Sequence, residues 1–174
     1  MTLPVMGSSV VDSELFRRLL RRHAAAVVVI TAPGLVAAGV PPTGFTATSF
    51  TSVSLDPPLV SFNLARAASA WPAVDAAAVV AVHVLGRGQE RVARTFAARG
   101  IDRLAAYGQW RAGPEGVPLL EGVLARVVCR VVDRVAAGDH TIVLASPERG
   151  DHHVDESETP LVYHAGRYAG LNGS

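Results

Sequence analysis

Short segments suited to β-strands dominate this chain, and the helical stretches between them are few and brief. Runs rich in Val, Ile, Thr or Phe lie at residues 25–31, 43–54, 59–64, 79–85 and 124–135, with shorter ones at 141–145, 161–164 and 167–171. Helical composition is confined to residues 12–22, 67–74 and 89–99. A doubly wound parallel sheet needs a long helix between successive strands, so this order argues against one. The pattern predicts a mostly β fold, an antiparallel barrel with short peripheral helices.

Three of the predicted strands, residues 27–31, 59–64 and 79–85, are apolar at both odd and even positions. Successive side chains of a strand point to opposite faces of the sheet, so both faces of these strands need cover. One face can line the barrel interior, whereas the predicted helices offer little area for the other. The sequence therefore predicts that a second subunit covers it, in a two-fold homodimer.

Composition limits the class of protein and its partners. The 174 residues are 49% hydrophobic and 18% charged, which is enough apolar material for one folded domain, expected at residues 12–171 after a flexible tail at 1–11. A net charge of +1 gives no long-range reason to bind nucleic acid or a membrane. No secretory signal or membrane-spanning run is found, so a cytoplasmic location is expected. The lone Cys129 sits in an apolar run and is interpreted as a buried thiol.

Several motifs that carry chemistry are missing from the sequence. It contains no Gly-x-Gly-x-x-Gly fingerprint, no lysine for a phosphate-binding P-loop and no Gly-x-Ser-x-Gly elbow. No Cys/His pairs have zinc spacing, and adjacent His152 and His153 would point to opposite sides of a strand, so no metal site is expected. The reactive chemistry of an enzyme with this sequence would therefore reside in a bound cofactor.

Three polar segments remain as candidates for a site. On one continuous strand over residues 43–54, Thr46, Thr48, Phe50, Ser52 and Ser54 would share a face. The hydroxyls of the threonines and serines suit a flat ligand edged with carbonyls and ring nitrogens, or a phosphate. A strand whose face is simply solvated would have the same sequence pattern.

The second segment is Gly138-Asp139-His140, typical of a hairpin turn, with a histidine that could contact a ligand at the next strand's start. The third is the basic side of the first helix, which we interpret as solvated rather than as an anion site; it comprises Arg17, Arg18, Arg21 and Arg22.

The order of these motifs resembles the flavin reductase family with the FMN-binding split-barrel fold, a Greek-key arrangement. The resemblance spans residues 14–171. Its main elements are the run at 43–60, the Gly138-Asp139-His140 turn and the closing segment at 160–168. Members of that family are the reductase components of two-component flavin monooxygenases.

The resemblance implies a function and a set of site residues. It implies transfer of a hydride from NADH or NADPH to FMN or FAD, with the reduced flavin passing to a partner monooxygenase, and it implies a homodimer. His140 would lie beside the nicotinamide. The flavin would contact Thr46, Ala47, Thr48, Ser49, Ser52 and Ser54, with its phosphate end at Asn63 and Ser69.

The chain departs from the family pattern at two places. His83 stands where the family often has asparagine. After Gly138-Asp139-His140, the strand runs into Pro147, which is expected to interrupt strand pairing and leave residues 146–159 as a loop. Two other kinds of protein also fit the residues. The first is a split-barrel flavoprotein that holds its flavin permanently and either carries electrons or acts on an organic substrate. The second is a flavin- or haem-binding module without turnover.

Overall fold

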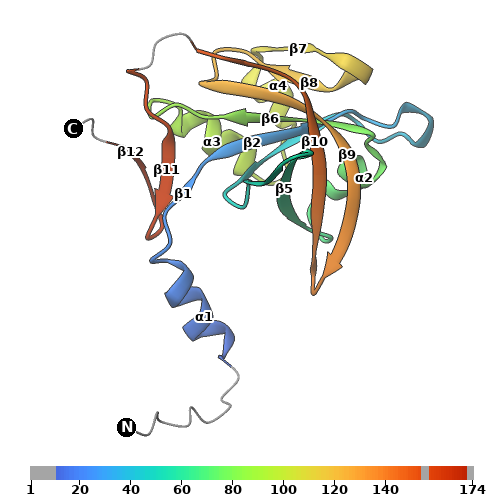
Figure 1. Cartoon of the computed structure of the whole chain (residues 1–174). Helices are drawn as coiled ribbons and strands as arrows, with labels where there is room; N and C mark the ends of the chain where they lie inside the picture. Colours follow the sequence, from blue (N-terminus) through green and yellow to red (C-terminus); the bar gives the residue numbers. More distant parts are fainter. Residues whose placement is uncertain (1–10, 154–156, 172–174) are drawn as a thin grey trace, which may run out of the picture.

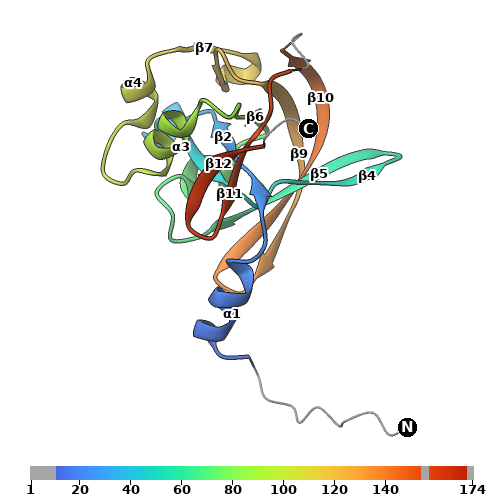
Figure 2. The same ribbon diagram turned by 90° about the vertical axis from the view of Figure 1, so that its left-hand side faces the viewer.

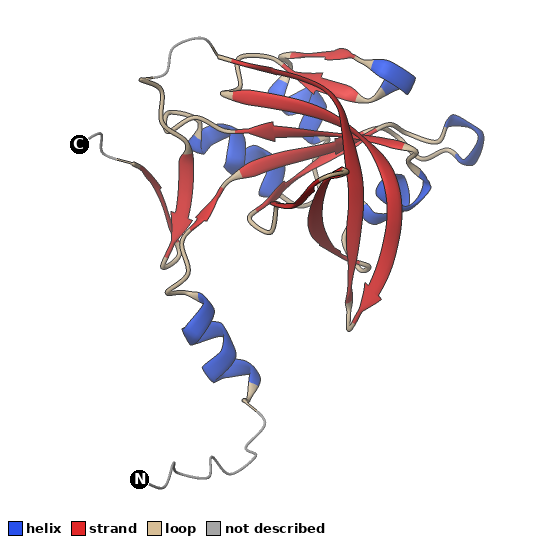
Figure 3. Ribbon diagram, in the orientation of Figure 1, coloured by secondary structure: helices blue, strands red, loops and turns tan. Residues whose placement is uncertain are grey.

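The computed structural model describes residues 11–153 and 157–171. Most of the expected tail at residues 1–11, and part of the expected loop at 146–159, therefore lie outside the described residues. Strands dominate the fold and the helices lie at its periphery (Figure 3). All pairings between strands are antiparallel. The predicted mostly β, antiparallel fold with short helices is thus confirmed.

A seven-stranded sheet forms the body of the molecule (Figure 1). Its strands, in spatial order, are β3 (Thr43–Ala47), β2 (Val28–Ala32), β6 (Val79–Val84), β9 (Ala125–Ala137), β10 (His140–His152), β5 (Pro58–Ala65) and β4 (Thr51–Leu55). Two smaller sheets flank it, one of β1 (Ala25–Ala26), β11 (Leu161–His164) and β12 (Arg167–Gly170), the other of β7 (Trp110–Ala112) and β8 (Pro118–Leu120).

The two edge strands of the large sheet, β3 and β4, are consecutive in the chain. Only Thr48, Ser49 and Phe50 connect them, a link that can reach at most about 14 Å. The sheet must therefore curl until its two edges approach each other, which makes a barrel with a seam between β3 and β4. The side chain of Ser49 bonds to the backbone of Asn63 on β5, across this seam.

The barrel interior holds the largest hydrophobic core. Strands β2, β3, β5, β6, β9 and β10 contribute to it, and α2 (Trp71–Ala76) packs on it through Ala73 and Val74. Cys129, as predicted, is fully buried in this core, and burial raises the pKa of its thiol to about 12.

The outer faces of β2 and β6 are covered by the same chain. Val27, just before β2, and Val29 pack with Phe96 of α3 (Glu90–Ala97), Leu104 of α4 (Arg103–Tyr107) and Leu120 of β8. On β6, Val79 and Ala81 pack with Val117 and with Leu119 of β8. All residues of β2 are buried in consequence. The expectation that these strands need a second subunit for cover is wrong, because short helices together with the β7–β8 ribbon supply enough surface.

Four expectations about individual elements also need correction. Helical segments were expected only at 12–22, 67–74 and 89–99, whereas α4 is a further helix, capped by Asp102. The run at 43–54 is two strands rather than one, since the chain turns at residues 48–50 to cross the seam. The helix expected at 67–74 begins at Trp71, with Pro72 in its first turn, where the missing N–H costs nothing. Pro147 does not end its strand, because β10 continues to His152 through a register shift between Pro147 and Arg149.

The first helix, α1 (Ser13–Leu20), stands away from the barrel in both views (Figures 1 and 2). Asp12 caps it by accepting hydrogen bonds from the backbone N–H groups of Glu14 and Leu15. None of its residues is buried. Among the described residues, no helix is both long and apolar enough to cross a bilayer.

Candidate functional site

A cleft follows the seam of the barrel. It has a volume of about 390 Å³, and its walls come from β3, the 48–50 connection, β5 and the start of β10. The predicted site residues that line it are Thr46, Ala47, Thr48, Ser49, Asn63 and His140. The seam thus brings together three segments that are far apart in the sequence.

Two hydroxyls in this cleft have partners within the protein. Thr46 Oγ1 donates to the carbonyl of Ala93 at 2.6 Å, which ties β3 to α3. Ser49 Oγ accepts from the backbone N–H of Asn63 at 2.9 Å. These bonds fix the walls of the cleft, and Thr48 between them is exposed.

A second cleft of about 570 Å³ adjoins the first, because Phe45, Thr46, Leu64 and Ala65 line both. We call the two together the seam groove. Its far end holds Ser69, Arg99 and Arg103, so cations gather there beside a hydroxyl. Both volumes lie in the range of sites for small molecules and cofactors. The groove fits a ligand with a polar-edged ring at one end and a phosphate at the other.

Arg103 is held in place by three hydrogen bonds. Its Nε donates to the carbonyl of Ala98 at 2.7 Å, Nη1 to the carbonyl of Gly44 at 3.0 Å, and Nη2 to Ser69 Oγ at 3.2 Å. Asp102 caps α4 by accepting from the N–H of Ala105 at 3.0 Å, which sets where Arg103 begins the helix. Burial lowers the pKa of the guanidinium, which nevertheless stays charged at neutral pH.

The turn that carries His140 connects β9 to β10, as predicted, with Gly138 at φ 61°. Arg66 clamps it: the backbone N–H of Arg66 donates to the carbonyl of Asp139 at 3.1 Å, and its guanidinium donates to the carbonyls of His140, at 2.7 Å, and of Gly138. His140 Nδ1 lies 2.7 Å from the carboxylate of Asp139, and this hydrogen bond lowers the pKa of Asp139. The clamp fixes the histidine at the groove.

Ser52 and Ser54 lie outside the seam groove. They are on β4, beyond the turn, and a register shift between them interrupts the alternation of that strand. The shared face expected over residues 46–54 therefore does not exist, because both the turn at 48–50 and this shift change the direction of the side chains.

Two arginines that line the groove, Arg99 and Arg103, and a third that holds the His140 turn, Arg66, were not among the predicted site residues. Arg103 lies within residues 14–171, over which the sequence resembles the family, but outside the main elements of that resemblance. The contacts of Arg66 and Arg103 join residues 59 to 74 positions apart, which no local pattern reveals.

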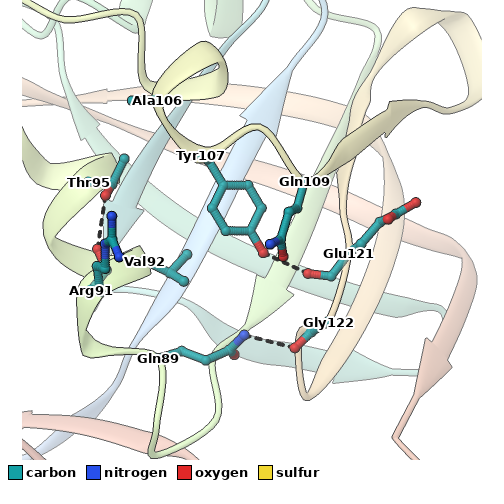
Figure 4. Close-up of a pocket in the computed structure, with 9 residues that line it drawn as sticks. All are labelled: Gln89, Arg91, Val92, Thr95, Ala106, Tyr107, Gln109, Glu121 and Gly122. Carbon is teal, nitrogen blue, oxygen red and sulfur yellow. Dashed lines mark hydrogen bonds between the residues drawn. The ribbon is translucent and has the colours of Figure 1, made fainter.

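A separate pocket of about 300 Å³ lies between α3, α4 and the turn after β8 (Figure 4). It shares no lining residue with the seam groove. Its walls are tied together by Tyr107 Oη, which donates to the carbonyl of Glu121 at 2.7 Å, and by Gln89, which donates to the carbonyl of Gly122 at 2.8 Å. These bonds hold α3 and α4 against the rest of the chain.

Comparison with known proteins identifies relatives over nearly the whole chain. An NADH:FMN oxidoreductase of Rhodococcus qingshengii is 40% identical over 155 residues, 88% of this chain and 79% of that protein. The reductase subunit of a flavin-dependent monooxygenase from Mycobacterium tuberculosis is 32% identical over 94% of this chain and 85% of its own length.

The fold has equally close counterparts among solved structures. An NADH:FAD oxidoreductase of Streptomyces globisporus C-1027, solved with NAD and FAD fragments, superposes with a TM-score of 0.83 at 32% identity, over 95% of this chain and 98% of that one. This agreement confirms the predicted split-barrel fold. The family model named flavin reductase like domain matches residues 20–172. The chain therefore belongs to the flavin reductase like domain family.

Proposed function

We propose that the protein is an NAD(P)H:flavin oxidoreductase that transfers a hydride from a nicotinamide cofactor to FMN or FAD. The observation that carries the proposal is the seam groove, which has a hydroxyl- and amide-lined end beside His140 and a cationic end at Ser69, Arg99 and Arg103. The relatives named for NADH:FMN and NADH:FAD oxidoreduction support the same activity.

We assign the flavin to this groove. Residues 46–49 and Asn63 would surround the ring system and its polar side chain, and Ser69 with Arg103 would bind the phosphate. A guanidinium recognises phosphate through paired N–H donors, and Arg103 is already held with its Nη2 at the serine hydroxyl. Ser52 and Ser54, on β4, have no place in this assignment.

His140 is assigned to the nicotinamide. Its turn is fixed by Arg66, and its side chain lines the part of the groove assigned to the flavin ring. When bound, the flavin supplies the redox chemistry, as the acceptor of the hydride from the nicotinamide. The protein contributes orientation: the groove holds the two rings together and excludes water from between them.

The reduced flavin would pass to a partner monooxygenase. The relative from Mycobacterium tuberculosis is named as such a reductase subunit, which supports this part of the proposal.

A steady-state assay of the purified protein tests the proposal. NADH or NADPH should be oxidised only when FMN, FAD or riboflavin is added, and one of the six combinations should dominate. Protein that is purified yellow, with activity that needs no added flavin, would indicate a permanently held cofactor. The absence of turnover with all six combinations would exclude the reductase function.

A further inference from the structure

A third cleft, of about 530 Å³, lies between α1 and the turn that joins β11 to β12. We call it the helix cleft, and its walls include Arg17, Arg21, His23, Thr48, Tyr163 and Gly166. Figures 1 and 2 both show the end of α1 beside this turn, and the N–H of Ala165 donates to the carbonyl of Arg21 at 3.2 Å. The match to the family model covers residues 20–172 and by itself gives this cleft no function.

The charge of the helix cleft is positive. Arg17 and Arg21 are four residues apart along α1 and its C-terminal end, so they lie on one side of the helix. The residues that line the cleft include no aspartate or glutamate. Arg18, on another side of the helix, lies 3.8 Å from Glu14, whereas the ion pairs among the described residues include neither Arg17 nor Arg21.

Arg21 is placed by the backbone of the neighbouring turn. Its Nη2 lies 3.1 Å from where a Cβ on residue 166 would be, so a larger residue than glycine would push the guanidinium away. Gly166 also has φ 84°, a conformation that side chains disfavour. The turn therefore leaves room for the arginine to reach over it into the cleft.

Thr48 joins the helix cleft to the seam groove, because this residue lines both. A ligand whose ring lies at His140 can thus extend past Thr48 toward Arg17 and Arg21. A nicotinamide nucleotide has this form, with a ring at one end and a diphosphate beyond it. Guanidinium groups are the side chains best suited to bind such phosphates, through paired hydrogen bonds and charge.

We propose that the helix cleft binds the phosphates of the nicotinamide nucleotide, with Arg17 and Arg21 as the binding residues. This inference rests on the proposed function and adds the site of its second substrate. It also revises the interpretation of the basic side of the helix, because two of its four arginines face a cleft rather than open solvent.

The test compares two double variants of the same helix. Arg17→Ala/Arg21→Ala removes the two arginines of the cleft, and Arg18→Ala/Arg22→Ala removes the same charge from residues that do not line it. The first variant should raise the KM for the nicotinamide nucleotide about 10- to 100-fold, the loss expected for charge-assisted hydrogen bonds. Its kcat and its Kd for flavin should stay within about twofold, and the control variant should resemble the original protein.

A binding measurement accompanies the kinetics and does not require turnover. ADP, which carries the diphosphate without the nicotinamide, should bind the original protein and the control variant in calorimetry, and bind the Arg17→Ala/Arg21→Ala variant much more weakly. Equal ADP binding and equal KM in all three proteins would overturn the inference. So would a parallel loss of flavin affinity, since the cleft would then belong to the flavin.

Failure of this inference can be distinguished from failure of the proposed function. If the original protein shows no flavin-dependent oxidation, the proposed function fails, and ADP binding still decides whether the helix cleft takes a diphosphate. If the original protein is active and the first variant is unchanged, only the assignment of the cleft fails. Circular dichroism of each variant checks that α1 remains helical, as expected because its arginines are exposed.

Discussion

His140 is the side chain on which the proposed orientation of the nicotinamide depends. Arg66 holds the backbone of its turn, and its imidazole lies 2.7 Å from the carboxylate of Asp139, so the position of the residue at the groove is set before a ligand arrives. A contact that is already oriented costs less conformational entropy when the substrate binds. Because the family resemblance puts this histidine beside the nicotinamide, we expect it to act on the nucleotide and to contribute little to flavin affinity.

Replacing His140 with alanine removes that contact. We expect kcat/KM for the nicotinamide nucleotide to fall about 10- to 100-fold, as for the loss of one hydrogen bond in the transition state, while the Kd for flavin stays unchanged. Steady-state kinetics and a flavin titration of the same preparation measure both. A collapse of flavin affinity with an unchanged nucleotide KM would show that His140 belongs to the flavin site instead.

His83, the departure from the family pattern, has a structural role. It is fully buried; its Nδ1 lies 3.0 Å from the carbonyl of Val29, and its Nε2 accepts from the N–H of Leu120 at 3.0 Å. The imidazole thus joins β6 to β2 and to β8 as a neutral ring, with its proton on Nδ1. Burial lowers its pKa from 6.5 to about 4.

This shift predicts a loss of stability in mild acid. Above pH 6.5 the ring is neutral in both the folded and the unfolded chain, so the free energy of unfolding is unaffected. Between pH 6.5 and 4 the unfolded chain takes up the proton first, which lowers the free energy of unfolding by about 3 kcal/mol in total. Urea unfolding at pH 7 and pH 4.5 measures the loss.

A His83→Gln variant is the control for this effect. Glutamine keeps a side chain that can form hydrogen bonds and does not titrate, so the variant should lose less stability between the two pH values than the original protein. The carboxylates contribute equally to both proteins and cancel in the difference. An equal loss in the two would mean that His83 does not cause the pH dependence.

At the scale of elements, the packing of α3 on β3 depends on one glycine. A Cβ on Gly44 would lie 2.7 Å from Cε1 of Phe96 and 3.2 Å from Cγ2 of Thr31. Phe96 is fully buried between the helices and the sheet, so it cannot move aside freely. The close approach of α3 in turn supports Thr46 and Arg103 at the seam groove, through the bonds to Ala93 and Gly44.

We therefore expect Gly44→Ala to lower the free energy of unfolding by about 1–3 kcal/mol, the usual cost of overpacking a core. It should also weaken flavin binding, because Arg103 bonds to the carbonyl of residue 44. Gly88→Ala is the matched control, since a Cβ there meets nothing within 4 Å and the change should be nearly neutral. Equal melting temperatures for the two variants would contradict this account of the packing.

The segments that the sequence could predict are those whose residues favour a single structure. The β-branched run expected as one strand at residues 25–31 is buried from Val27 onward, as expected, but Val27 separates β1, which pairs with β11, from β2. The run at 43–54 was predicted incorrectly because threonine and serine suit both strands and turns, and only the closing of the barrel decides that residues 48–50 turn.

The same reason explains the parts of the site that were missed. Arg66 reaches the 138–140 turn, and Arg103 reaches β3, only after the whole sheet has formed. Pro147 was expected to end a strand, yet β10 absorbs it with a register shift opposite Cys129. Such long-range contacts override local preferences. The sequence therefore indicated which segments line the groove, but not the arginines that are brought to them from elsewhere in the chain.

For the whole molecule, the described chain leaves a substantial apolar surface exposed. The large side chains concerned lie on α1, β4 and β9, outside the helix cleft, and most are about half exposed or more: Leu15, Phe16, Leu19, Val53, Leu55, Val132 and Val135. The α1 helix has no buried residue at all, and a short isolated helix is only marginally stable in water. Exposed apolar side chains in such numbers are typical of surfaces that a partner covers.

We expect a second copy of the chain to cover this surface, in a two-fold dimer that buries roughly 2,000 Å² or more. The dimer was expected from the apolar strands and from the family resemblance. Because the outer faces of β2 and β6 are covered by the same chain, the argument from these two strands no longer applies, and the exposed side chains of α1, β4 and β9 now carry the structural case. Sedimentation equilibrium at micromolar concentration should give the mass of a dimer. The Phe16→Glu/Leu19→Glu variant should be a monomer, because a charged side chain at each of these apolar positions opposes burial in an interface. The control is Val36→Glu, which should leave the dimer intact because Val36 is 94% exposed and lies outside α1, β4 and β9. A stable, active monomer of the original protein would refute the dimer, and α1 would then have to be stable without cover.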